Sequence, residues 1–179
     1  MDIFSHVLWS IALGKIISIK TKLKVNLKWI GFLGAFPDIF AFTLLFVVSI
    51  FTGSTFHPQD HGATQFHWLF KVTELLYSLS HSLVIFAIVI ISIYIIKRKV
   101  LYVLLGWGLH IILDILTHTK EFFPTPFLYP LSNFLINGIT WRQNWFLITN
   151  YIVLTTIFTY LYRKELFKFI KKLRILRSK

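Results

Sequence analysis

The longest apolar run of the chain, residues 27–51, reads LKWIGFLGAFPDIFAFTLLFVVSIF and contains only two charged residues, Lys28 and Asp38. A helix needs about 20 mostly apolar residues to cross the hydrocarbon core of a bilayer. The run is continuous rather than alternating between apolar and polar residues, which argues against a strand of a membrane barrel. Residues 27–51 therefore predict a transmembrane helix.

The composition of the whole chain also indicates a membrane protein. Of the 179 residues, 56% are apolar and 15% are charged, whereas soluble domains average about 45–50% and about 25%. A soluble domain of this composition would expose large apolar patches, and a disordered chain would leave even more apolar surface in water. The chain has no cysteine, which excludes disulfides, iron–sulfur clusters and a cysteine nucleophile.

Four further apolar runs are long enough to cross the membrane, so we expect five spans: Ile3–Ile19, Leu27–Phe51, Leu79–Ile96, Val100–Leu116 and Trp145–Tyr162. Cytoplasmic loops of membrane proteins are enriched in lysine and arginine. Five alternating spans put all the basic residues except Lys71, Lys120 and Arg142 on one side. The sequence thus predicts an all-α polytopic bundle with its N-terminus outside, its C-terminus inside, and longer outer loops at about 52–78 and 117–144.

The net charge of +12 comes from basic clusters beside the apolar runs. This placement is typical of membrane-flanking charge, so we do not expect nucleic-acid binding. Residues 1–162 are predicted to form one membrane-embedded domain, and residues 163–179 a basic cytoplasmic tail. Apolar residues recur at helical spacing in that tail. It is either an amphipathic helix on an anionic leaflet or a generic anchor that stops translocation.

Ionisable residues inside the apolar runs are the most informative feature of the sequence. A charged group at mid-bilayer costs at least about 2.5–3.5 kcal/mol, so each needs a partner or a polar cavity. At 1.5 Å of helical rise per residue, these side chains lie about 15–28 Å above the inner basic clusters, within a core of about 30 Å. All therefore fall in the outer half of the membrane, where antiparallel helices could bring them together: His6, Asp38, His81, His110, Asp114 and His118.

His110 and Asp114 are four residues apart, so they share one helix face and can present a nitrogen and an oxygen to one ion. His118 extends the same stripe by one turn. Imidazole and carboxylate without thiolate suit a divalent metal such as zinc, and one or two ions are expected. Each residue could instead hydrogen-bond a neighbouring helix. His57, His61 and His67 fall in the first outer loop, where solvated side chains are expected.

The motifs that contain these residues occur in a recognisable order. They are Ser5-His6, Gly34-Ala35-Phe36-Pro37-Asp38, Ser80-His81-Ser82 and Gly108-Leu109-His110-Ile111-Ile112-Leu113-Asp114. In this order the chain resembles the YdjM-like (LexA-regulated) family of membrane-bound metal-dependent hydrolases, over roughly residues 1–120. The resemblance implies an inner-membrane protein with a metal-dependent hydrolytic site.

The same order is also similar to zinc-dependent phospholipase C and related nucleases. By position, that likeness implies metal ligation by His6, Asp38, His81, His110, Asp114 and His118. The chain departs from the YdjM-like pattern in two places. Phe40 stands where a second aspartate often occurs, and Leu76-Tyr77-Ser78 stands where many members have His-Arg-Gly. A His–x3–Glu pair is absent, because Glu121 follows His118 by three residues.

We therefore expect a membrane-embedded, metal-dependent hydrolase of phosphoesters, including phospholipid headgroups, in the inner (cytoplasmic) membrane. Asp38 is the candidate general base, and membrane lipids are the expected partners. The alternative is a non-catalytic membrane protein, either a carrier of ions or protons or a degenerate relative with a structural role.

Overall fold

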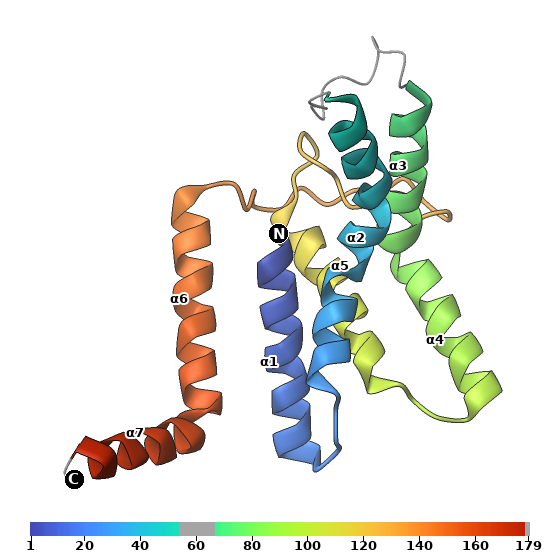
Figure 1. Cartoon of the computed structure of the whole chain (residues 1–179). Helices are drawn as coiled ribbons and strands as arrows, with labels where there is room; N and C mark the ends of the chain where they lie inside the picture. The colour runs from blue at the N-terminus through green and yellow to red at the C-terminus, as the bar shows by residue number, and fades with distance from the viewer. Residues whose placement is uncertain (54–66, 178–179) are drawn as a thin grey trace.

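The computed structural model describes residues 1–53 and 67–177, which form seven α-helices and one 3₁₀ helix (Figure 1). The predicted all-α class is therefore confirmed. Two helices, α1 (Ile3–Thr21) and α2 (Leu27–Thr52), are each long and apolar enough to cross a membrane. Counting each bent helix pair as one span raises the number of candidate spans to four.

Helices α1 and α2 form an antiparallel hairpin. Asp2 caps α1 by accepting a hydrogen bond from Ser5 N, and Asn26 caps α2 in the same way. The two helices approach closely at Gly34. A Cβ there would lie 2.2 Å from Ser10 Oγ and 2.8 Å from the carbonyl oxygen of His6. Glycine thus allows the contact that sets α1 against the segment of α2 that carries Asp38.

Helix α3 (His67–Ser80) corrects the expectation of a long outer loop over residues 52–78. Its residues Leu69, Phe70, Thr73 and Tyr77 are buried and spaced at three or four residues, which gives α3 one face to pack on α2. His67 begins this helix and is exposed. His57 and His61, also expected in the loop, lie outside the described residues.

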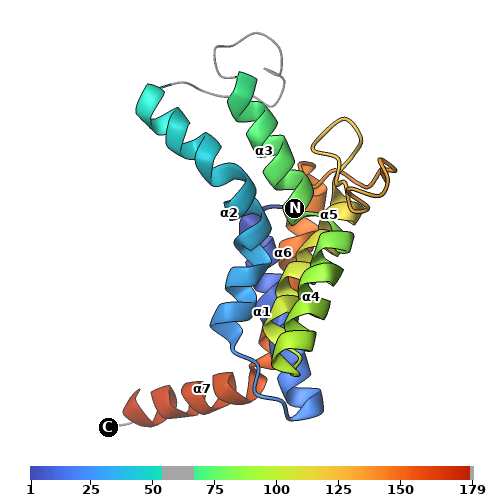
Figure 2. The same cartoon turned by 90° about the vertical axis from the view of Figure 1, so that its right-hand side faces the viewer.

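The predicted third span, Leu79–Ile96, is not one continuous helix. Helix α3 ends at Ser80, α4 (Leu83–Lys97) begins at Leu83, and the two are bent by 57° at the break. Ser82 starts α4 because its hydroxyl accepts hydrogen bonds from Val84 N and Ile85 N. His81 therefore lies in the break between α3 and α4, two helices whose courses Figure 2 shows.

Helix α5 (Leu105–Thr117) follows the short 3₁₀ helix η1 (Tyr102–Leu104) and packs against α1 and α2. Gly106 permits this packing, since a Cβ there would lie 2.2 Å from the carbonyl oxygen of Ile30. The apolar segment Tyr102–Thr117 is shorter than the helices that qualify as spans.

Helix α6 (Asn144–Leu161) is joined to α1 by polar side chains. Trp9 Nε1 donates to Asn150 Oδ1 at 2.9 Å, and Asn150 Nδ2 donates to Ser5 Oγ at 2.8 Å. Helix α7 (Arg163–Arg177) then turns away from α6 by 72° (Figure 1). Residues 118–143, between α5 and α6, cover the end of the bundle at which α1 begins.

Candidate metal centre

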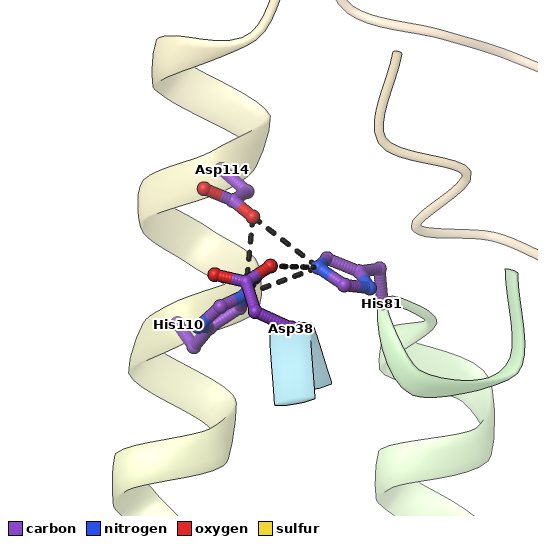
Figure 3. A group of neighbouring side chains, drawn as sticks. All are labelled: Asp38, His81, His110 and Asp114. Atoms are coloured by element: carbon purple, nitrogen blue, oxygen red, sulfur yellow. Dashed lines mark hydrogen bonds and ion pairs between the residues drawn. The ribbon is translucent and has the colours of Figure 1, made fainter. Parts of the chain in front are cut away.

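Four ionisable side chains from three parts of the chain meet inside the bundle. Asp38 comes from α2, His81 from the α3–α4 break, and His110 and Asp114 from α5 (Figure 3). Each offers one ligand atom, and these atoms all lie within 4.8 Å of one another. This group, called the metal centre below, could hold a metal ion.

Backbone carbonyls fix the directions of the two imidazoles. His110 Nδ1 lies 2.7 Å from the carbonyl oxygen of Gly34, and His81 Nδ1 lies 3.0 Å from that of Tyr77. A carbonyl oxygen only accepts, so each Nδ1 carries the proton and each Nε2 is left with a lone pair in the neutral ring. Histidines that bind metals are typically held in this way, by a hydrogen bond from the other ring nitrogen.

The two Nε2 atoms point at each other across only 3.0 Å. Asp114 Oδ2 lies 3.1 Å from Nε2 of His110 and 3.4 Å from Nε2 of His81. Two lone pairs and a carboxylate oxygen thus converge where His81, His110 and Asp114 are fully buried. Such an arrangement of acceptors requires a cation between them, either a proton or a metal ion.

Asp38 completes this group from the side of α2. Its Oδ1 lies 3.5 Å from Nε2 of His81 and 3.7 Å from Nε2 of His110. Its side chain is 18% exposed, whereas those of the other three residues are 0% exposed. Asp38 is therefore the one carboxylate of the group with exposed surface.

The second oxygen of Asp114 faces a different set of nitrogens. Oδ1 lies 3.0 Å from Nε2 of His6, 3.5 Å from Nε2 of His118 and 2.5 Å from the amino group of Met1. His6 is fully buried, and among the described residues neither of its ring nitrogens has a hydrogen-bond partner. The 3.0 Å contact of His6 with Asp114 is thus close in distance but lacks hydrogen-bond geometry. Asp114 links this second cluster of nitrogens to the first.

Tyr77 connects the metal centre to His118. Its ring stacks on His81 at 3.8 Å between centroids, and its hydroxyl lies 3.1 Å from Nδ1 of His118. The same hydroxyl donates to the carbonyl oxygen of Phe123 at 3.1 Å.

A cavity of about 860 Å³ opens beside the metal centre, between α2, α3 and the segment that follows α5. Tyr77 lines it, and so does Phe42, which lies one helical turn after Asp38. The walls are mostly apolar and aromatic. They also carry four charged side chains: Glu74, Lys120, Glu121 and Arg142.

A comparison against known families identifies the family of the chain. The family model of the YdjM inner membrane protein matches residues 1–175. The chain belongs to the YdjM inner membrane protein family. This membership confirms the resemblance drawn from the sequence and extends it beyond residue 120, into α7. No curated protein and no solved structure matches the chain.

The inner-membrane location of this YdjM family member is likewise confirmed. All six residues selected from the sequence (His6, Asp38, His81, His110, Asp114 and His118) lie in or next to the metal centre. The metal-binding role of each, and the role of Asp38 as a base, stay predictions. Phe40 is 42% exposed on α2, and Glu121 lines the cavity rather than the centre.

Two groups of this YdjM family member that contact residues of the metal centre were not predicted from the sequence: the side chain of Tyr77 and the amino group of Met1. Tyr77 precedes His81 by four residues. Residues at this spacing share a helix face, so the stacking of Tyr77 on the His81 ring could have been predicted from the sequence. No pattern of side chains in the sequence predicts a role for the amino group of Met1. Its contact with Asp114 depends on where α1 begins relative to the end of α5.

Proposed function

We propose that this YdjM family protein is a membrane-embedded, metal-dependent hydrolase of phosphoesters. The observation that carries the proposal is the 3.0 Å approach of the two Nε2 atoms of His81 and His110 beside Asp114 Oδ2. Imidazole nitrogens and carboxylate oxygens are the ligand atoms that zinc prefers in sites without thiolate. The other ring nitrogen of each of the two histidines is held by a backbone carbonyl, as is typical of histidines that bind metals.

In this proposal His81, His110 and Asp114 hold the first ion, and Asp38 either completes the ligand set or stays free beside it. A structural zinc site is closed by four protein ligands, whereas a catalytic one keeps a position open. The 18% exposure of Asp38 and its longer contacts, 3.5 and 3.7 Å, favour the second arrangement. Asp38 then faces the open position.

A second ion would use the other side of Asp114. Its Oδ1, together with Nε2 of His6 and Nε2 of His118, forms a separate set of ligand atoms, in which an ion would take the place that the Met1 amino group holds at 2.5 Å from Oδ1 and 3.1 Å from Nε2 of His118. The lack of any hydrogen-bond partner for the buried His6 ring, among described residues, supports this assignment. A carboxylate shared by two ions is typical of two-metal hydrolytic sites.

A bound divalent ion supplies water with a lowered pKa, near 7, and positive charge at the reacting phosphoryl group. The residues of the chain supply the rest of the chemistry. The Asp38 carboxylate accepts a proton from the attacking water while the water oxygen bonds to phosphorus. The ester P–O bond breaks, and the leaving alkoxide takes up the proton that Asp38 received from the water. Tyr77 holds His81 by stacking and His118 by its hydroxyl.

We further propose five crossings, with the N-terminus outside and residues 1–162 as the embedded domain. The basic loops after α1 and α4 lie at the same end of the bundle as α7, which supports a single cytoplasmic side (Figure 1). The metal centre then lies in the outer half of the membrane. The cavity beside it carries Lys120 and Arg142 together with Glu74 and Glu121, and we propose that the two basic residues meet the phosphate of a phosphoester such as a phospholipid headgroup from the outer leaflet.

The test is metal analysis of the purified protein together with hydrolysis of a chromogenic phosphodiester in detergent. Wild type should carry stoichiometric divalent metal, whereas Asp114→Ala, which removes the carboxylate shared by both ions, should carry almost none and His110→Ala should keep at most the second ion; neither variant should hydrolyse the ester. His67→Ala is the matched control, because His67 is an exposed histidine on α3. Equal, near-zero metal in all four proteins contradicts the proposal. Metal without hydrolysis, or proton or metal flux in proteoliposomes, favours the non-catalytic alternative.

A further inference from the structure

A second cavity lies far from the metal centre, at the end of the bundle where α1 ends and α6 meets α7. It measures about 690 Å³ and lies between the last turns of α1 and the α6–α7 bend. Four of its lining residues are basic (Lys15, Lys20, Arg163 and Lys164), and Glu165 is the one acidic residue of the lining. We call this cavity the basic groove.

The basic groove combines this charge with apolar walls. Ile16 of α1 and Ile157 and Leu161 of α6 contribute its apolar walls, and its basic residues come from α1 and from the first turn of α7. An amphiphile with an anionic head and an aliphatic chain matches both features. A soluble anion matches only the first, because it has no use for the isoleucine and leucine walls.

The helix bend that forms the groove is held by specific contacts. Lys15 Nζ lies 3.4 Å from Glu165 Oε1 and 4.3 Å from the centre of the Tyr162 ring, so α1 is tied to the first turn of α7. Arg163 donates to the carbonyl oxygen of Tyr160 at 2.7 Å and stacks over the ring of the same residue. Lys15 and Arg163 are therefore already engaged by the protein.

Lys20 and Lys164 differ from these two residues. Within the part of the chain that the structure describes, they form no ion pair or side-chain hydrogen bond, although both line the groove. Lys20 comes from α1 and Lys164 from α7, so two different helices each contribute one of these lysines to the lining of the groove. A pair of unengaged cations from different helices is suited to a phosphate group held between them.

Helix α7 has the orientation that such a ligand requires. It departs from α6 by 72°, and its apolar residues Leu166, Phe169 and Leu173 are 46%, 58% and 48% exposed. A basic amphipathic helix with these features lies in the plane of the headgroups. The groove therefore opens where the phosphates of one leaflet are found.

We propose that the basic groove binds an anionic phospholipid of the cytoplasmic leaflet, with its phosphate between Lys20 and Lys164 and an acyl chain along α1 and α6. The inference depends on the membrane location of the protein and, for the choice of leaflet, on the orientation proposed above, and not on any hydrolytic activity. The proposal gives a role to α7, which contributes no residue to the metal centre.

The test measures the binding of phosphatidylglycerol and phosphatidylcholine to the full-length protein in detergent, by native mass spectrometry. Wild type should retain phosphatidylglycerol and bind phosphatidylcholine weakly. The double variant Lys20→Gln/Lys164→Gln should lose about tenfold in affinity for phosphatidylglycerol. Lys97→Gln/Lys99→Gln is the control, because it removes the same charge at the end of α4, outside the groove. This control should change the affinity by less than about twofold.

Three results would overturn the proposal. In the first, the control variant loses as much affinity as the groove variant, which means that total charge rather than the groove attracts the lipid. In the second, wild type binds both lipids equally. In the third, glycerophosphoglycerol, which has no acyl chains, competes as well as the intact lipid. Unchanged metal content in the groove variant would establish that its metal centre is still folded.

Discussion

His110 and Gly34 are joined by a hydrogen bond of 2.7 Å between the imidazole Nδ1 and the glycine carbonyl oxygen, across the packed faces of α5 and α2. This bond turns Nε2 of His110 towards His81 and Asp114. Gly34 also has no side chain in the space next to Ser10 and His6. One glycine thus serves both the packing of the helices and the direction of a candidate ligand.

Close packing at glycine gives the first prediction. In Gly106→Ala the new Cβ would lie 2.2 Å from the carbonyl oxygen of Ile30, a backbone atom that cannot move without shifting α2. Overpacking of this kind costs about 1–3 kcal/mol, so the unfolding temperature in detergent should fall. Ser92→Ala, at an exposed position of α4, should change stability by less than about 0.5 kcal/mol. Equal melting curves for both variants would contradict the packing of α5 on α2.

Removal of the metal gives the second prediction. A ligand that binds only the folded protein stabilises it by RT ln(1 + [L]/Kd). Dialysis of wild type against a strong chelator should therefore lower its unfolding temperature, on the order of 10 °C for an ion present at about a thousand times its Kd. Adding zinc back should restore it. Asp114→Ala, which removes the carboxylate shared by both proposed ions, should not respond to either treatment, and an equal response of this variant would mean that the metal binds elsewhere.

Tyr77 carries the third prediction, which two substitutions separate. Tyr77→Phe keeps the ring that stacks on His81 but removes the hydroxyl that contacts His118 and Phe123. Tyr77→Leu removes both. Residues that orient metal ligands typically contribute about 10–100-fold to metal affinity. We expect Tyr77→Phe to weaken one of two bound ions and Tyr77→Leu to weaken both, measured by competition with a zinc-binding dye. Wild-type affinity in Tyr77→Leu would exclude any positioning role.

The sequence was sufficient to select the residues of the centre because their signals are local. His110, Asp114 and His118 share a helical stripe, and the depths of His6, Asp38 and His81 follow from counting residues along continuous apolar runs. Each of these inferences needs only the rise and period of a helix. The structure brings all six residues together as those depths suggested.

The break at His81 was beyond such counting because distant parts of the chain stabilise it. Ser82 Oγ donates to the carbonyl oxygen of Tyr129 at 2.5 Å, and Leu83 N donates to that of Phe127 at 2.9 Å. Polar backbone groups in a membrane-embedded break need such partners, and these come from the segment after α5. The apolar run Leu79–Ile96 taken alone predicts one helix, because its own residues do not indicate these contacts with the segment after α5.

Asp38→Asn gives the last prediction and decides between its two possible roles. The amide keeps the size of the side chain but is a poor base and a weaker ligand than a carboxylate. If Asp38 is the general base beside an open position, the variant should bind metal with wild-type stoichiometry while hydrolysis falls about 10²–10⁴-fold. If Asp38 is instead a ligand, metal affinity and activity should fall together, and excess zinc should recover part of the activity. The exposure of Asp38 and its contacts of 3.5 and 3.7 Å, longer than the 3.1 Å between Asp114 and His110, favour the first result. Metal titration of the variant, followed by hydrolysis at saturating metal, separates the two, and full activity would remove Asp38 from the reaction altogether.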